Sequence, residues 1–332
     1  MSAAGVAEMA GRIAPYVVLL IVWTVLPFIL PRNITDLLVF AGIYAIAGFG
    51  VSLLLGHCGI VNLAQAVFYG VGAYATAYLT TELGYPSIAG VLVGAVISVV
   101  IALFIGWPIL RLTSYFLALA TLALSIIGNA LFYEWDWLTQ GTLGIGGIPK
   151  LNIGSFALDT PMRFYYLAWT VAILCLVLAR NLTNSRTGLM LRAMRDAPDA
   201  AVSLGVNLQW LRTRVFMLSA LFGSIAGSLF AHYSSFVSVQ SFNVDKSFSF
   251  LLIAVLGGAR APWGAIIGAL FITILPEYLS RLGDFHQILF GVALICIVVF
   301  LPTGLAGGLE MLWDRLLRLG PKPKLKQAAH AE

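Results

Sequence analysis

Charged residues are scarce in this chain. Of its 332 residues only 10% are Asp, Glu, Lys or Arg, while 60% are hydrophobic and the mean hydropathy is +0.96. A soluble globular domain averages roughly a quarter charged residues and less than half apolar residues. This composition excludes a soluble enzyme, a disordered chain and a small secreted domain held by disulfides. It indicates an all-α, polytopic membrane protein whose backbone polar groups are satisfied within helices.

Lysine and cysteine are also rare, and their positions argue against three kinds of site. The chain has five lysines, none of which follows a glycine, so it contains no G-x-x-x-x-G-K-[ST] loop for binding a nucleotide. Its three cysteines are an odd number without C-x-x-C spacing, which argues against a disulfide framework or a metal site. We therefore expect no metal, no cofactor and no ATPase activity in this chain.

Ionisable side chains are nearly absent from the interior of the apolar segments. The nearest acidic residues fall at predicted ends, where water reaches them: Glu82, Asp245, Glu277 and Asp284. Carboxylates and histidines inside a membrane mark proton- or ion-coupled transporters. Their scarcity disfavours a secondary transporter that works alone, and it indicates an energy source on another polypeptide. A passive channel is also disfavoured, because no ring of charges or filter-like repeat is visible.

Ten apolar segments are predicted to enter the bilayer, which takes about 20 residues for each crossing helix. They span residues 13–30, 34–55, 63–81, 87–110, 113–133, 163–181, 214–236, 248–256, 263–279 and 286–301. Two long polar loops separate them, at 134–162 and 182–213. We predict one transmembrane domain over 1–305, followed by a basic tail over 306–332.

The distribution of basic residues predicts the orientation. If the N-terminus lies inside and each segment crosses once, 14 of the 19 Lys and Arg residues fall on the cytoplasmic side. Both termini and the 182–213 loop are then cytoplasmic, and the 134–162 loop is external. This bias also explains the net charge of +5, so we expect a lipid bilayer and no nucleic acid as the partner of the basic residues.

Paired glycines interrupt the apolar pattern at two places. The first break contains Gly56 and Gly59, and the second contains Gly257 and Gly258. Non-helical backbone at membrane depth is tolerated only where protein or a water-filled cavity satisfies it, and the next helix begins with free N–H groups that favour a carboxylate. Each break is otherwise an ordinary interfacial turn. After the first break come Asn62 and Gln65, which either line a polar route or cap and join helices.

The cytoplasmic loop 182–213 carries the densest cluster of charge. Within it an i, i+3, i+4, i+7 pattern predicts a helix with one apolar face, made of Met190, Ala193, Met194 and Ala197. Arg192, Arg195 and Asp196 lie off that face. Pro198 suits the first turn of a second short helix, which ends at Gly205. This two-helix element is either a docking element for a partner or a charged loop on the membrane surface.

Three stretches together resemble a known family. The first is GHCGIVNLAQAVF at 56–68, with the small residues after it. The second is YFLALATLA at 115–123, followed by GIGGIP at 144–149. The third begins with SRTG at 185–188, continues through RAMRD and LGV, and ends with VLGG at 255–258 and WG at 263–264. In this order the chain is similar to the inner-membrane permeases of branched-chain amino acid ABC transporters, of the LivM type. The resemblance spans about residues 35–305.

The resemblance implies an importer with several subunits in a bacterial inner membrane. This chain would form a heterodimer with a second, related permease. Two cytoplasmic ATPases would bind ATP and Mg²⁺, and a periplasmic binding protein would deliver the substrate. The residues expected to couple this chain to the ATPases are Arg186, Gly188, Arg192, Ala193, Arg195, Asp196, Asp199 and Gly205. Those expected to border the substrate route are Gly56, Gly59, Asn62, Gln65, Gly257 and Gly258.

The chain departs from the family pattern beside the first break. Ile60, Asn62, Ala64 and Gln65 stand where Gln, Ser, Gly and His are commoner in the family. A branched-chain or other aliphatic amino acid is the expected substrate, and relatives with the same framework resemble importers of urea, short amides or aromatic acids.

Overall fold

The computed structural model describes residues 27, 30–112, 114–153, 156–280, 285–301 and 303–308. The predicted first segment, 13–30, and the basic tail beyond residue 308 lie outside these residues. The other nine predicted segments are all helical. In chain order they are α2 (Arg32–Leu53), α3 (Gln65–Thr81), α4 (Ser87–Ile109), α5 (Ser114–Glu134), α7 (Pro161–Asn184), α10 (Leu208–Ser234), α11 (Val244–Gly257), α12 (Gly264–Ser280) and α13 (His286–Phe300).

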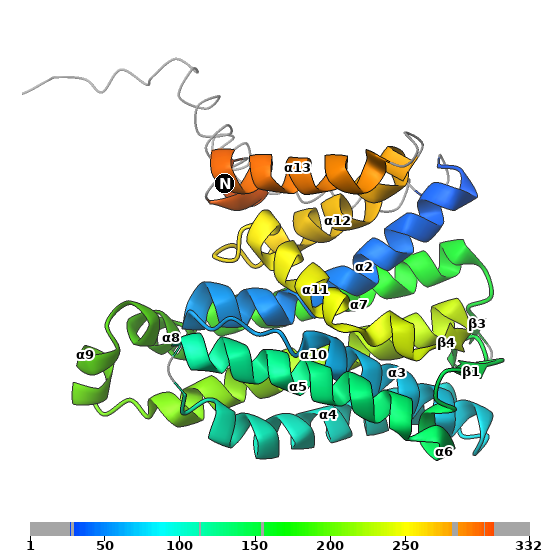
Figure 1. The fold of residues 1–332 in the computed structure, drawn as a ribbon, viewed down its shortest axis with the longest axis horizontal. Coiled ribbons are helices and arrows are strands. Elements are labelled where there is room, and N and C mark those ends of the chain that lie inside the picture. Colours follow the sequence, from blue (N-terminus) through cyan, green and yellow to red (C-terminus); the bar gives the residue numbers. More distant parts are fainter. Residues whose placement is uncertain are drawn as a thin grey trace, which may run out of the picture.

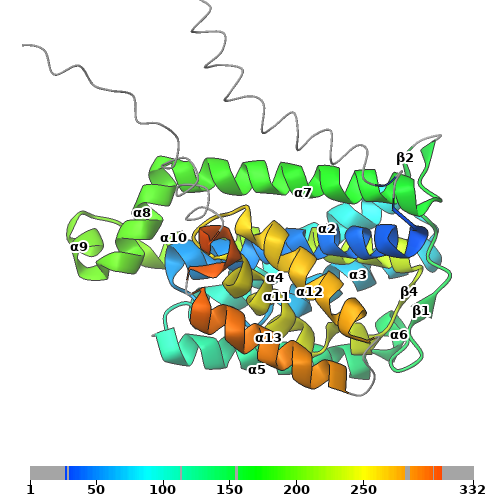
Figure 2. The same cartoon turned by 90° about the horizontal axis from the view of Figure 1, so that it is seen from above.

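The long helices run side by side, with shorter elements at the two ends of the bundle (Figures 1 and 2). At one end lie α8 (Arg186–Asp196) and α9 (Pro198–Ser203). At the other end lie α6 (Asp136–Thr139), η2 (Val239–Phe242) and four two-residue strands: β1 (Ile145–Gly146), β2 (Asn152–Ile153), β3 (Phe156–Ala157) and β4 (Phe236–Val237). The first and last strands pair antiparallel, as do the middle two, so the loop 134–162 is fastened to the end of α10.

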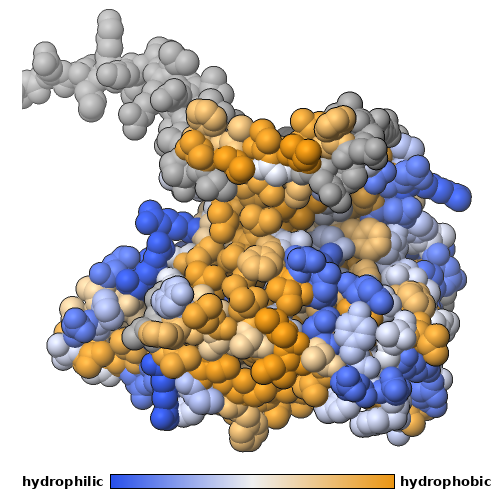
Figure 3. All heavy atoms as spheres, viewed as in Figure 1, coloured by the Kyte–Doolittle hydropathy of each residue, from blue (hydrophilic) through white to orange (hydrophobic). Residues whose placement is uncertain are grey.

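Five described helical segments are long and apolar enough to cross a membrane. They are α2 with its continuation to Cys58, α4, α5, α7 and α10. Figure 3 shows apolar side chains covering the middle of the molecule, with hydrophilic side chains mainly toward its two ends. The described chain is therefore a multi-pass, all-α membrane protein.

Helices α2 and α10 form the centre of the bundle. Their apolar windows are 83% and 72% buried, compared with 22% for α4 at the periphery. Helix α10 packs against α2, α3 and α4, and α2 also packs against α7, α11 and α12. Because lipid is as apolar as leucine, close packing of small residues holds such helices together.

Helix α4 shows this packing along its whole length. Its buried residues recur every four positions and are small: Gly90, Gly94, Ser98, Ala102 and Gly106. A Cβ on Gly90 would lie 2.8 Å from the Thr76 backbone of α3, and one on Gly94 would lie 3.1 Å from Gly72. The small-residue stripe thus lets the peripheral helix approach the central ones at backbone distance.

Candidate functional site

The first glycine break separates two helices in the middle of the bundle. Helix α2 continues as a π-helix, η1 (Leu54–Cys58), and stops at Gly59, whose φ of 68° lies in the left-handed region that favours glycine. Residues 60–64 are not helical. Gln65 begins α3. Its side-chain nitrogen, Nε2, donates to the backbone carbonyls of Ala47 on α2 (3.2 Å) and Ser219 on α10 (3.0 Å). Both acceptors lie near the middle of their helices, so α3 begins at membrane depth.

Polar side chains satisfy the backbone of this break. The N–H of Leu63 donates to Thr121 Oγ1 on α5 (3.2 Å), and that of Ala66 donates to Ser247 Oγ on α11 (3.0 Å). The N–H of Ala64 donates to Asn62 Oδ1 (2.9 Å). The sequence predicts free N–H groups here, and this is wrong for the N–H groups of Leu63, Ala64 and Ala66. Helices α5 and α11 supply the hydroxyls that an isolated membrane helix lacks at its start.

Asn62 and Gln65 form the centre of a buried polar network. Both are 0% exposed. Asn62 Nδ2 donates to Gln65 Oε1 (3.2 Å), and Ser219 Oγ donates to the same oxygen (3.0 Å). In this conformation the two side chains cap and join helices, which is the second of the two roles left open by the sequence. Their predicted position on the substrate route stays a prediction.

The hydroxyl partners of this network were not identified from the sequence. Thr121, Ser125, Ser219 and Ser247 are each 0% exposed, and Ser125 Oγ lies 3.2 Å from Ser247 Oγ. Small hydroxyls are common in these helices: α5 carries Thr121 and Ser125, and α11 carries Ser247 and Ser249. Their presence in the sequence does not show which of them meet.

The second glycine break lies directly against the first. A Cβ on Gly56 would collide with the carbonyl of Ala259. Gly257 is packed against the Gly264 carbonyl, and Gly258, with φ of 98°, lies against Gly304. The second break is thus held by contacts between backbones, while the first is held by side-chain hydrogen bonds. The structure brings the two predicted breaks together.

The polar loop 182–213 forms the two predicted short helices, α8 and α9. Ser185 Oγ accepts from the Gly188 N–H (3.3 Å) and begins α8, and Gly205, with φ of 82°, follows α9. The predicted apolar face of α8 is only partly correct, because Met194 is buried but Ala193 and Ala197 are exposed.

The buried face of α8 contains Gly188, Leu191 and Met194. A Cβ on Gly188 would collide with the Thr183 carbonyl at the end of α7. This close approach turns the helix so that Leu191, which is 0% exposed, faces the bundle. Apolarity alone could not reveal that rotation.

Arg195 joins the α8–α9 element to the first break. The sequence pattern predicts that it lies off the face that packs against the bundle. Instead its guanidinium donates to the carbonyl of Gly56, and a Cβ on Gly59 would lie 3.2 Å from its Cγ. Arg192 donates to the Thr183 carbonyl (2.9 Å) at the end of α7. Two of the predicted coupling arginines therefore bind the backbone of their own subunit.

The remaining predicted coupling residues face outward. Arg186, Ala193, Asp196 and Asp199 are exposed, as is Gly205. Two apolar side chains lie beside them in water, Leu189 at 62% and Leu204 at 83% exposed. This outward face combines exposed leucines with charges of both signs.

The described part of the chain contains no cluster of three or more His, Cys, Asp or Glu residues that could hold a metal ion. His232 Nδ1 lies 2.8 Å from the carbonyl of Pro149, which is a structural contact between α10 and the external loop. The site thus consists of a buried polar network at a break between two helices, connected through Arg195 to the exposed α8–α9 element.

Comparison with known proteins gives one consistent result. Residues 33–298 match the family model described as branched-chain amino acid transport system / permease component. The chain is 26% identical over 312 residues to the high-affinity branched-chain amino acid transport system permease protein LivM of Escherichia coli strain K12, covering 87% of this chain and 73% of that protein.

Two further relatives have different names. One is the permease protein LivH of the same transport system in Escherichia coli strain K12, at 26% identity over 81% of this chain and 92% of that protein. The other is the autoinducer 2 import system permease protein LsrC of Yersinia pseudotuberculosis, at 26% identity over 82% of this chain and 79% of that protein. Together with the multi-pass helical fold, these matches show that the chain belongs to the family of branched-chain amino acid ABC transport permeases.

Proposed function

We propose that this chain is one permease subunit of a binding-protein-dependent ABC importer for branched-chain or other aliphatic amino acids. A second, related permease completes the pore, two ATPases that bind ATP and Mg²⁺ dock from the cytoplasm, and a periplasmic protein delivers the substrate. The chain spans the bacterial inner membrane ten times with both termini in the cytoplasm. The names of the LivM and LivH relatives support the substrate and the pairing.

The contact between Arg195 and the Gly56 carbonyl is the observation that carries this proposal. A docking element is useful only if its movement reaches the membrane part. Here α8 is anchored to the point where α2 stops being helical, and the outward face beside it is left exposed with two leucines in water. Large apolar side chains exposed to water mark interaction sites.

The proposed movement begins when ATP closes the two ATPases. The α8–α9 element follows the ATPase to which it is bound, and Arg195 pulls on the first break. The break moves as a unit with the second one, because Gly56 is packed on Ala259. Access to the substrate route then changes from one side of the membrane to the other. A ligand can drive such a change only by binding the two states with different affinity.

A different small solute in the same importer class is the second candidate. The LsrC relative, whose name describes autoinducer 2 import, has the same framework at the same identity. Urea, short amides and aromatic acids remain the other candidates, since Asn62 and Gln65 differ from the family pattern at the first break.

Reconstitution tests the proposed function directly. The four-subunit complex in liposomes should accumulate leucine only when ATP is supplied on the ATPase side and the binding protein is supplied on the other. Uptake by this chain alone, driven by a proton or sodium gradient, would instead establish a secondary transporter. Competition by urea, amides and aromatic acids in the same assay separates the substrate classes.

One substitution tests the docking face without disturbing the fold. Leu204→Asp changes a side chain that is 83% exposed, so the permease should fold, but the ATPases should no longer co-purify with it. Leu143→Asp in the external loop is the matched control, because Leu143 is 81% exposed and lies at the opposite end of the helix bundle. Normal ATPase binding by the Leu204 variant would rule out this face as the docking surface.

A further inference from the structure

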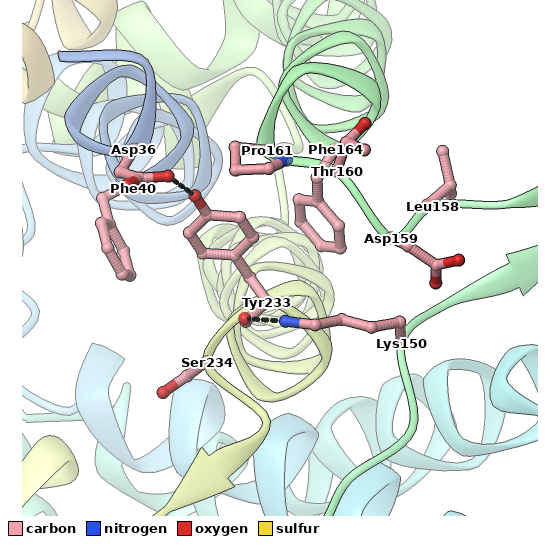
Figure 4. A pocket seen from close by; sticks show the side chains of 10 residues that line it. All are labelled: Asp36, Phe40, Lys150, Leu158, Asp159, Thr160, Pro161, Phe164, Tyr233 and Ser234. Carbon is pink, nitrogen blue, oxygen red and sulfur yellow. Dashed lines mark hydrogen bonds between the residues drawn. The ribbon is translucent and has the colours of Figure 1, made fainter. Parts of the chain in front are cut away.

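A cavity of about 360 Å³ lies at the external end of the bundle. Its walls come from the start of α2, the end of α10, the start of α7 and the external loop (Figure 4). The volume falls within the range of about 300–1,000 Å³ that is usual for small-molecule sites. The cavity is distinct from the glycine breaks, which lie toward the opposite end of α2, and the sequence did not point to it.

The cavity contains charges of both signs, held apart by one tyrosine. Lys150 Nζ donates to the carbonyl of Tyr233 (2.8 Å), and the hydroxyl of Tyr233 donates to the carboxylate of Asp36. Figure 4 shows Tyr233 between the two, with the carboxylate of Asp159 on the side of the external loop. The ammonium and the Asp36 carboxylate are therefore separated by the length of the tyrosine.

These charges are not fully used by the protein itself. A lysine ammonium has three donors, and among the described contacts Lys150 donates in one hydrogen bond and lies 5.7 Å from the ring centroid of Tyr233. Within the described residues it makes no ion pair with Asp36 or Asp159. Asp159 is exposed and Asp36 is half-buried. Donors and acceptors of opposite charge remain available in one cavity.

Apolar side chains form the rest of the wall. Phe40 and Phe164 lie beside the Tyr233 ring, with ring centroids 5.2 Å and 4.9 Å from it, and Leu158 lines the cavity on the loop side. A ligand that suits these walls has a cationic group, an anionic group and an apolar part of a few carbons. An aliphatic α-amino acid has these three features.

We propose that this cavity is an external receiving site for the zwitterion of an aliphatic amino acid. Lys150 binds its carboxylate, Asp36 binds its ammonium, and Phe40, Leu158 and Phe164 contact its side chain. The inference rests on the proposed function, since it concerns an amino acid released at the external face. Charge-assisted hydrogen bonds at both ends would select a zwitterion over molecules with one charge.

A second cavity, of about 510 Å³, lies next along α2 and shares Phe40 with the first. Tyr44, one helical turn further, lines it, and Phe40 packs against both Tyr44 (6.1 Å between centroids) and Tyr233. Lys246 Nζ lies 3.7 Å from the centroid of the Tyr44 ring. Phe40 is therefore a wall shared by the receiving site and the neighbouring cavity.

Three ligands test the proposal on the intact permease complex in nanodiscs, without the binding protein. L-Leucine has both charges, leucinamide lacks the carboxylate and 4-methylpentanoate lacks the ammonium. The wild type should bind leucine about tenfold or more tightly than either analogue. Lys150→Gln should remove the preference over leucinamide alone, and Asp36→Asn the preference over 4-methylpentanoate alone.

Arg32→Gln is the control, because Arg32 is an exposed cation at the same end that does not line the cavity, and its preferences should equal those of the wild type. Unchanged preferences in both cavity variants would overturn the proposal, as would the absence of saturable leucine binding at millimolar leucine. Measuring ATP-driven leucine uptake by the same wild-type complex distinguishes failure of the receiving site from failure of the proposed function. Uptake without leucine binding in the cavity refutes the receiving site alone, while uptake of no amino acid refutes the proposed function.

Discussion

The two glycine breaks meet in space but are held in different ways. In the first, the N–H groups of Leu63 and Ala66 donate to the hydroxyls of Thr121 and Ser247 on other helices. The second is closed by its own turns and by contact between the backbones of Gly257 and Gly264. Similar sequence patterns, an apolar run followed by paired glycines, therefore produce a joint made of hydrogen bonds and a joint made of close packing.

This difference gives the breaks different roles. Among the contacts of the described residues, only the first break is bonded to the α8–α9 element, through Arg195 and the Gly56 carbonyl. Hydrogen bonds between side chains and backbone can exchange partners as helices shift, whereas packed backbones move together or come apart. We therefore expect the first break to rearrange during transport and the second to follow it as a rigid piece.

The largest effects should come from adding a methyl group where the breaks are packed. In Gly56→Ala the new Cβ meets the Ala259 carbonyl, and in Gly257→Ala it meets the Gly264 carbonyl. Backbone cannot give way as the end of a side chain can, so each change should lower the free energy of unfolding by about 3 kcal/mol. Unfolding in detergent with increasing denaturant measures this.

Gly291→Ala provides the control for both variants. Gly291 lies on α13, where a Cβ added to it would meet no other atom within 4 Å, so its substitution should leave stability nearly unchanged. If Gly56→Ala behaved like Gly291→Ala, the close contact between the two breaks would not exist, and if Gly257→Ala did so, the backbone packing within the second break would not exist.

The polar network should show the next largest effect, and only in the first break. Gln65→Leu leaves Asn62 Nδ2 and Ser219 Oγ without their shared acceptor in a fully buried position. An unsatisfied buried polar group costs about 1–3 kcal/mol, so we expect a loss of about 2 kcal/mol in the same unfolding assay. Gln240→Leu, at an exposed position, should change little.

The helices of this fold could be predicted from the sequence because each is a long apolar run bounded by polar residues. The two short cytoplasmic helices were also predictable, since Pro198 and Gly205 are local signals. The buried face of α8 was not, because the close approach of Gly188 to Thr183 depends on how α7 ends. Periodicity reports which residues share a face but not which face meets the protein.

The sites themselves were predictable only in part. Both breaks and Arg195 can be singled out from the sequence, but Arg195 does not lie off the packed face as expected, since its guanidinium donates to the Gly56 carbonyl. Its expected role in coupling stays a prediction. The cavity around Lys150 and Asp36 could not be found, because its walls come from three segments that are far apart in the sequence, 36–40, 150–164 and 233–234. A lone lysine in a loop and a lone aspartate at a helix start carry no common pattern.

Removing the hydrogen bond between Arg195 on α8 and the first break should uncouple ATP hydrolysis from transport. Arg195→Gln removes a charge-assisted hydrogen bond to the Gly56 carbonyl, which is worth about 1.5 kcal/mol, or roughly tenfold in a coupling equilibrium. Leucine uptake for each ATP hydrolysed should fall by that factor while the ATPases remain bound. Arg180→Gln, at an exposed position near the end of α7, serves as the control, and equal uptake in the two variants would refute this transmission.

The smallest effect should come from the outermost hydrogen bond of the network. Ser125 Oγ and Ser247 Oγ lie 3.2 Å apart, and Ser247 keeps its bond with the Ala66 N–H when Ser125 is changed. Hydrogen bonds between membrane helices contribute about 0.6 kcal/mol on average, so Ser125→Ala should lower stability by about that amount. Ser247→Ala should cost clearly more, because it also leaves the Ala66 N–H at the start of α3 without its acceptor. Equal losses in the two variants would mean that the backbone of the first break is satisfied in another way, and its contrast with the second break would then disappear.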